Sequence, residues 1–147
     1  MRAITIKELN KDNWYDCCEL SLTPEQEEFM EPNAVSIAQT KYEPSLRAYA
    51  IYDDNTIVGF CMYNSEPEEL DGYWIYRIMI DKEHQRKGIG KAATEAMIQE
   101  MAQIPGCNRI VVGYHHENLG AHNLYKRCGF KDHGHRFGVE KAVLLDL

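Results

Sequence analysis

The stretch that decides the fold reads Asp81-Lys-Glu-His-Gln85-Arg86-Lys87-Gly88-Ile89-Gly90-Lys91. It follows an apolar run, Trp74 to Ile80, and leads into a helical pattern, so the sequence predicts a strand, a glycine-rich loop and a helix. Gly88 and Gly90 leave room for a backbone that curls around a ligand. The first turn of the helix has N–H groups without intrahelical partners, which indicates an anion-binding site.

Two other phosphate-binding motifs do not fit this loop. A dinucleotide-binding fingerprint would need a third glycine where this chain has Ala93. A Walker loop would end in Gly-Lys-Ser or Gly-Lys-Thr, and no such triplet follows. A pair of glycines between a strand and a helix can also form a simple tight turn, so this loop alone does not establish an anion-binding site.

A second segment, residues 108–130, provides that evidence. It contains a β-rich run from Arg109 to Tyr114 and then a helical pattern that stops at Gly129. The apolar residues on one face of this helix are Ala121, Leu124, Tyr125 and Cys128.

Together, the patterns Gln-x-x-Gly-x-Gly from Gln85 and Asn-x-x-Ala-x-x-Leu-Tyr-x-x-x-Gly-Phe from Asn118 resemble the two signatures of the GNAT acetyltransferases. The resemblance implies an α/β single-domain GNAT fold over residues 1–147. Its mixed, mostly antiparallel sheet is expected to carry helices on both faces and to have splayed central strands.

The composition agrees with a small enzyme domain. The 147 residues are 44% hydrophobic and 27% charged, which is ordinary globular usage. A net charge of -7, without a basic patch beyond the loop, disfavours nucleic acid as a partner. The N-terminus does not read as a signal peptide and no apolar run is long enough to span a membrane, so we expect a soluble, cytoplasmic protein without membrane association.

Cysteine and histidine usage indicates neither disulfides nor metal. The 5 cysteines are odd in number and lack a Cys-x-x-Cys motif, which favours reduced thiols. The pairs His115-His116 and His133-x-His135 have no further ligand at a familiar spacing, so no metal site is expected.

The other elements follow from periodicity and turn signals. Asp53-Asp54-Asn55 predicts a hairpin, and Thr23 with Gln26 predicts a capping box around a helix that starts at Pro24. Strands are expected at 2–7, 47–52, 56–63 and 74–80 and twice in 131–147, and helices at 14–22, 33–42 and 91–104.

The resemblance also implies roles for individual residues on the donor side. The backbone near Ile78, Met79 and Ile80 would meet the pantetheine arm and thioester of acetyl-CoA. Asn118 matches a residue that contacts this arm, and Tyr125 matches the general acid that protonates the departing thiolate. The pyrophosphate would be held, mainly by main-chain N–H groups, at Gln85, Arg86, Lys87, Gly88, Ile89, Gly90 and Lys91.

The base that takes a proton from the attacking amine stays open. A primary ammonium with a pKa near 10.4 is almost entirely charged at pH 7. Some polyamine-acetylating relatives carry a carboxylate at the position of Tyr76, where this chain has none. Glu31, Asp71 or a water chain could substitute, so Glu31, Asp71 and Tyr76 are the expected substrate-binding residues.

A longer resemblance suggests the acceptor. Segments between Phe29 and Asp81 are similar to bacterial spermidine and diamine N-acetyltransferases, and acidic clusters at 25–31 and 66–71 are expected to border the acceptor cleft and attract a polycation. We therefore expect direct acetyl transfer to a polyamine in a ternary complex, with a homodimer as one open possibility. Alternatives are another amine (an aminoglycoside, a peptide or a lysine) or a non-catalytic coenzyme A sensor.

Overall fold

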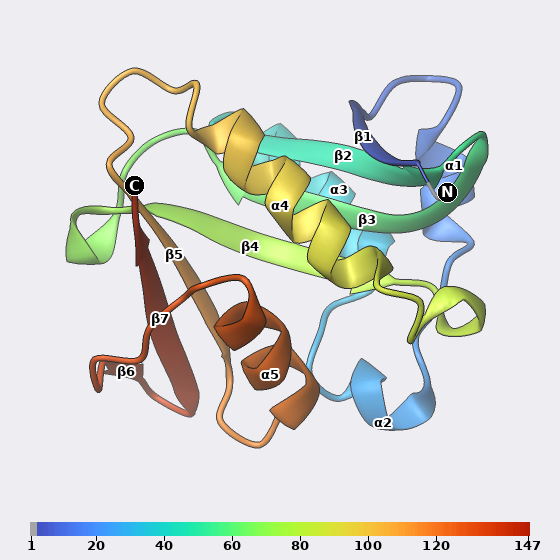
Figure 1. The fold of residues 1–147 in the computed structure, drawn as a ribbon. Coiled ribbons are helices and arrows are strands. Elements are labelled where there is room, and N and C mark those ends of the chain that lie inside the picture. Colours follow the sequence, from blue (N-terminus) through green and yellow to red (C-terminus); the bar gives the residue numbers. More distant parts are fainter. Residues whose placement is uncertain (1–2) are drawn as a thin grey trace.

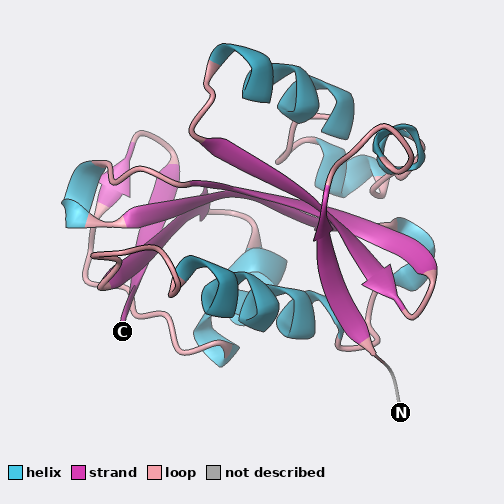
Figure 2. Cartoon of the chain, turned by 90° about the horizontal axis from the view of Figure 1, so that it is seen from above, coloured by secondary structure: helices cyan, strands magenta, loops and turns pink. Residues whose placement is uncertain are grey.

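In the computed structural model, which describes residues 3–147, one 7-stranded sheet lies between two layers of helices (Figures 1 and 2). The strand order is β1-β2-β3-β4-β5-β7-β6. The strands are β1 (Ile4–Glu8), β2 (Leu46–Asp53), β3 (Thr56–Asn64), β4 (Tyr73–Ile80), β5 (Arg109–His115), β6 (Arg136–Phe137) and β7 (Glu140–Asp146). The helices are α1 (Trp14–Cys18), α2 (Pro24–Glu27), α3 (Asn33–Tyr42), α4 (Ile89–Met101) and α5 (Leu119–Arg127), with short 3-10 turns η1 (Glu69–Asp71) and η2 (Lys82–His84). None of the helices within residues 3–147 combines the length and the apolar composition needed to cross a bilayer.

The sheet has the expected mixed, mostly antiparallel character. Every pair of neighbouring strands is antiparallel except β4 and β5. The predicted hairpin joins β2 to β3, and Asp54 at its tip has a positive φ of 54°. Aspartate tolerates this conformation better than most residues, which favours a tight turn here.

The two central strands splay apart, as the resemblance implied. β4 and β5 pair over only three positions each, Tyr73–Ile75 with Ile110–Val112. Past Ile75, β4 continues along β3 while β5 continues along β7. Alternate backbone N–H and C=O groups of residues 76–80 therefore face β5 without a strand partner.

The hydrophobic core lies on both faces of the sheet, because the central strands are buried on each face. On one face, Ala93, Met97 and Met101 of α4, spaced one helical turn apart, form a cluster with Ile51 and Ile78. The opposite face is covered by α1 and α3, which lie behind the sheet in Figure 1, and it buries a second cluster. Its buried members are Cys17, Leu46, Ala48, Ala50, Phe60, Met62 and Met79.

Several helices and strands begin or end at residues other than those predicted from the sequence. The first helix ends at Cys18 instead of residue 22, because Leu20 and Leu22 pack against the second cluster from a non-helical segment. The helix predicted from Lys91 begins at Ile89, since Gly88 caps it in a left-handed conformation (φ 77°). The predicted capping box at α2 and the helix at 33–42 are confirmed. The strand predicted at 2–7 is found at Ile4–Glu8, and its first position lies outside the described residues.

Candidate active site

A cleft with a volume of about 860 Å³ opens where β4 and β5 diverge. It is lined by the outer halves of both strands, by the starts of α4 and α5, and by the segment from α2 to the start of α3. Its lining includes most of the site residues that the sequence predicts. These are Glu31, Tyr76, Ile78, Met79, Ile80, Gln85, Arg86, Gly88, Ile89, Gly90, Lys91, Asn118 and Tyr125.

Two of the predicted site residues lie elsewhere. Lys87 is exposed on the loop and does not line the cleft. Asp71 is exposed in η1, where its charge acts on Arg109 at the start of β5. None of the acidic residues at 66–71 lines the cleft, because the loop that carries them packs at the closed end of the splayed pair.

The loop before α4 has the geometry of an anion site. Arg86 (φ 64°) and Gly88 (φ 77°) both take left-handed backbone conformations, and no side chain caps the start of the helix. A Cβ added at Gly90 would touch nothing closer than Leu124 at 3.7 Å, so the protein's own packing leaves this space open. Uncapped N–H groups and the positive end of the helix dipole fit a pyrophosphate.

Gln85 shapes this loop through its side chain. Its Nε2 donates to Gln26 Oε1 (2.8 Å) and to the backbone oxygen of Ile80 (2.9 Å), while Gln26 Nε2 donates to Gln85 Oε1 (3.0 Å). This amide pair ties α2 to the end of β4. Gln26 was not expected at the site, although the capping box that it forms with Thr23 had marked it as a structural residue.

Tyr125 lies buried on α5 at the inner wall of the cleft. Its ring stacks on Tyr114 (centroids 5.8 Å apart, 28° between planes) and meets Phe130 edge-on (5.7 Å, 70°). Burial raises the pKa of the Tyr125 phenol above its ordinary value, so the hydroxyl stays protonated. It has no hydrogen-bond partner among residues 3–147, and Tyr125 lines the cleft, so its proton is free for a ligand.

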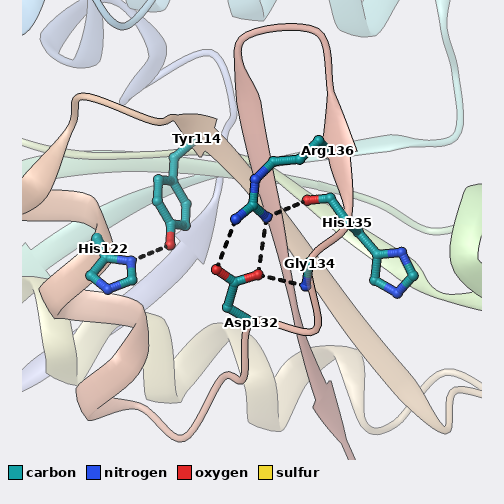
Figure 3. Close-up of polar contacts among 6 residues, drawn as sticks. All are labelled: Tyr114, His122, Asp132, Gly134, His135 and Arg136. Carbon is teal, nitrogen blue, oxygen red and sulfur yellow. Dashed lines mark hydrogen bonds and ion pairs between the residues drawn. The ribbon is translucent and has the colours of Figure 1, made fainter.

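A second tyrosine holds that ring in place. Tyr114 Oη lies 2.6 Å from His122 Nδ1, one turn before Tyr125 on α5 (Figure 3). Beside this pair, Asp132 accepts from the Gly134 N–H (2.9 Å) and from Arg136 Nη1 (3.0 Å), which lowers the pKa of Asp132 to about 2. Sequence reasoning missed Tyr114 and His122 because a contact from strand to helix leaves no local signal.

Asn118 begins α5 and also lines the cleft. Its Oδ1 accepts from the Ala121 N–H (3.1 Å) and so caps the helix. The side-chain NH2 group of Asn118 is then the part available to a ligand.

The charged side chains of the cleft are separated by element. Arg86 and Lys91 stand at the start of α4, and Arg127 at the end of α5. The segment from α2 to the start of α3 carries three carboxylates, Glu27, Glu28 and Glu31. Arg77 on β4 and Glu140 on β7 add one charge of each sign. Such a division suits a ligand pair in which one member is anionic and the other cationic.

One histidine cluster lies near the cleft. The possible ligand atoms of His115, His116 and Glu117 lie within 4.8 Å of one another at the end of β5. His115 Nδ1 already accepts from the Glu117 N–H (3.1 Å), and Phe29 packs on its ring (5.2 Å).

Comparison with known proteins identifies the family. Residues 8–130 match the Acetyltransferase (GNAT) family, so the chain belongs to this family, whose members use acetyl-CoA. The chain is 30% identical over 151 residues to the spermine/spermidine N(1)-acetyltransferase of Bacillus subtilis (strain 168), with 99% of both sequences covered. It is 31% identical, with the same coverage, to a probable spermine N(1)-acetyltransferase of Bacillus subtilis subsp. natto (strain BEST195).

Solved structures confirm the fold, but they do not indicate the acceptor of this chain. The spermidine N-acetyltransferase of Vibrio cholerae, in complex with CoA and spermine, superimposes with a TM-score of 0.77 at 18% identity, covering 97% of this chain and 95% of that one. The aminoglycoside acetyltransferase AAC(6')-Ib in complex with coenzyme A gives a TM-score of 0.79 at 13% identity, covering 98% and 95%. Enzymes with different acceptors therefore share this fold to the same degree.

Proposed function

We propose that this protein transfers an acetyl group from acetyl-CoA to a primary amine of a polyamine such as spermidine or spermine. The observation that carries the proposal is the division of charge in the cleft, where one lining segment carries Glu27, Glu28 and Glu31 and another, the loop before α4, carries basic side chains. A polyamine carries several positive charges, and a wall of carboxylates attracts it more strongly than it attracts a monoamine. Full-length similarity to spermine/spermidine N(1)-acetyltransferases also supports this acceptor.

The donor would lie across the starts of α4 and α5. The first-turn N–H groups of α4 would hold its pyrophosphate, with charge added by Arg86 and Lys91. Around Ile78, Met79 and Ile80, the edge of β4 that faces β5 has no strand partner, and its backbone groups other than the Ile80 oxygen held by Gln85 can bind an amide-containing arm, much as a sheet edge binds a peptide. Acetyl-CoA supplies an activated acyl group, and the protein supplies position and proton transfer.

Chemistry at the thioester would use two groups of this chain. A backbone N–H on the free edge of β4 can stabilise the developing oxyanion. Tyr125 keeps its proton until the thiolate forms and then donates it. Direct transfer is favoured over an acyl-cysteine, because burial raises the pKa of the nearby Cys128 thiol and so disfavours its thiolate.

The compartment is also part of the proposal. All 5 cysteines are free thiols. This supports a reducing environment such as the cytoplasm.

The test is release of free thiol from acetyl-CoA with spermidine, spermine, putrescine, an aminoglycoside and a lysine peptide as acceptors. We expect the highest kcat/KM with polyamines. Added salt should raise the KM for spermidine more than for a monoamine, because screening weakens a multivalent attraction more.

A charge variant sharpens this test. Glu28→Gln/Glu31→Gln should raise the KM for spermidine, whereas the control Asp12→Asn/Glu19→Gln, with the same charge change at exposed positions outside the cleft, should not. Equal effects of both variants, or higher kcat/KM for the aminoglycoside or the peptide, would contradict the proposed acceptor.

A further inference from the structure

Tyr76 occupies the point where the central strands part. The register of β3 and β4 shifts between Met62, opposite Arg77, and Tyr63, opposite Ile75, so Tyr76 is the extra residue of a β-bulge. Bulges reorient side chains and occur next to active sites. Tyr76 packs against the core cluster on the α1 and α3 face and also lines the cleft. It thus reaches the cleft from the face opposite α4 and α5.

Tyr76 lines the cleft, and its hydroxyl is hydrogen-bonded to a carboxylate outside the cleft. Tyr76 Oη lies 2.9 and 2.8 Å from the two carboxylate oxygens of Glu68 and donates to them. Asn64 Nδ2 donates to Glu68 Oε2 (2.9 Å), and the Glu68 N–H donates to the Gly72 oxygen (2.9 Å). Glu68 is half-buried and does not line the cleft. Fixed at both its backbone and its side chain, it joins Tyr76 to the outer surface.

We infer that Tyr76 and Glu68 form the path by which the acceptor amine loses its proton. The inference rests on the proposed function. An ammonium N–H bond breaks and its proton bonds to Tyr76 Oη, while the proton of Tyr76 moves to Glu68 and from there to water. The freed lone pair forms the N–C bond to the acetyl group. A second N–H proton leaves to water as the C–S bond breaks, while Tyr125 protonates the thiolate and regains a proton from water, so each transfer releases one proton.

The pair meets the requirements of such a path. The Tyr76 proton points to Glu68 and Asn64 donates toward one lone pair of Oη, so the second lone pair can accept from an amine. The charged groups around Tyr76 are Glu68, Glu43 at the end of α3, and Arg77, whose guanidinium donates to the Tyr76 backbone oxygen (2.8 Å). Burial and Glu68 raise the pKa of Tyr76 to about 12. The phenol therefore relays a proton instead of ionising itself.

The carboxylates that line the cleft have no comparable arrangement. Within residues 3–147, no hydrogen bond fixes the side chain of Glu27, Glu28, Glu31 or Glu140, and all four residues are exposed. They suit the attraction of a cation more than the removal of a proton at a fixed atom. The sequence could not reveal Glu68, since the acidic run at 66–71 gives no sign of which member reaches Tyr76.

Three variants test the path. Tyr76→Phe removes the hydroxyl, Glu68→Gln removes the charge but keeps two hydrogen-bonding atoms, and Glu69→Gln makes the same charge change at an exposed neighbour outside the cleft. With spermidine at pH 7 we expect kcat to fall about 10²-fold in the first two and to stay unchanged in the third. Acetyl-CoA affinity should stay unchanged in all three.

The pH profile separates a proton path from a structural role. As pH rises toward the pKa of the amine, the acceptor arrives neutral, so the deficit of Tyr76→Phe and Glu68→Gln should shrink. Glu68→Asp, which keeps the carboxylate, should recover part of the rate. The double variant should be no slower than either single variant, because both interrupt one path.

The possible negative results of these experiments lead to different conclusions. Full turnover in Tyr76→Phe and Glu68→Gln, or a deficit that is constant from pH 6 to pH 10, overturns the path and leaves the proposed function standing. If the unmodified protein acetylates an amine other than a polyamine, the same variants are measured with that amine, and an unchanged rate overturns the path. Unmodified protein that acetylates no amine overturns both.

Discussion

Replacing Tyr125 by phenylalanine should separate catalysis from stability. The ring contacts with Tyr114 and Phe130 remain, and the lost hydroxyl has no hydrogen-bond partner in the described part of the chain. No buried group is left unpaired, so we expect a change in the free energy of unfolding below about 0.5 kcal/mol, or about 2 °C in Tm. The rate is expected to fall by about 10² to 10⁴, the usual contribution of a general acid.

Tyr49→Phe is the matched control. Tyr49 is also buried against the α4 side of the sheet, but its hydroxyl contacts Tyr63 Oη (3.4 Å) and Glu100 Oε1 (3.2 Å), and it does not line the cleft. This variant should lose about 1 kcal/mol of stability and keep its turnover.

The assay combines thermal unfolding by circular dichroism with kcat for thiol release at saturating acetyl-CoA and spermidine. Because burial raises the pKa of Tyr125, its ionisation should not reduce kcat below about pH 10. Unchanged kcat in Tyr125→Phe, or a loss of stability equal to that of Tyr49→Phe, would refute the assignment.

Three further variants test contacts that support the site. In Gly59→Ala the new Cβ would overlap the Met79 backbone oxygen on β4, so we expect a loss of about 1–3 kcal/mol and a Tm lower by about 3–10 °C; an unchanged melting curve would contradict this. Gln26→Leu removes the amide that orients the pyrophosphate loop and should weaken coenzyme A binding about tenfold by calorimetry, and unaltered affinity would show that the loop holds its shape alone. The pKa of Asp132, lowered to about 2 mainly by Arg136, gives stability that is present above about pH 4 and lost as pH falls toward 2. Asp132→Asn should therefore melt lower at pH 7 but lose less Tm between pH 4 and pH 2, and parallel curves would rule out this contribution.

Local sequence signals predicted the parts of the site that lie close together in the chain. The loop at 85–91 forms within a strand, turn and helix, so its glycines, its helix start and its neighbouring apolar strand are all read from one segment. The hairpin at Asp54 and the capping box at Thr23 are local for the same reason.

What the sequence could not reveal depends on contacts between distant segments. The amides of Gln26 and Gln85 are 59 residues apart, and their contact exists only once α2 packs beside the loop. The bulge at Tyr76 arises from the register of β3 against β4 and has no local signature. The sequence-based prediction chose Asp71 from the acidic run at 66–71, yet Glu68 is the member that contacts a side chain lining the cleft.

The most direct test of acetyl transfer to a polyamine is product analysis by mass spectrometry. Purified protein is incubated with acetyl-CoA and spermidine, and acetylated spermidine and free coenzyme A are quantified together over many turnovers. We expect equal amounts of the two products, formed at a rate that depends on Tyr125. Binding of acetyl-CoA without any acetylated spermidine would contradict acetyl transfer to a polyamine.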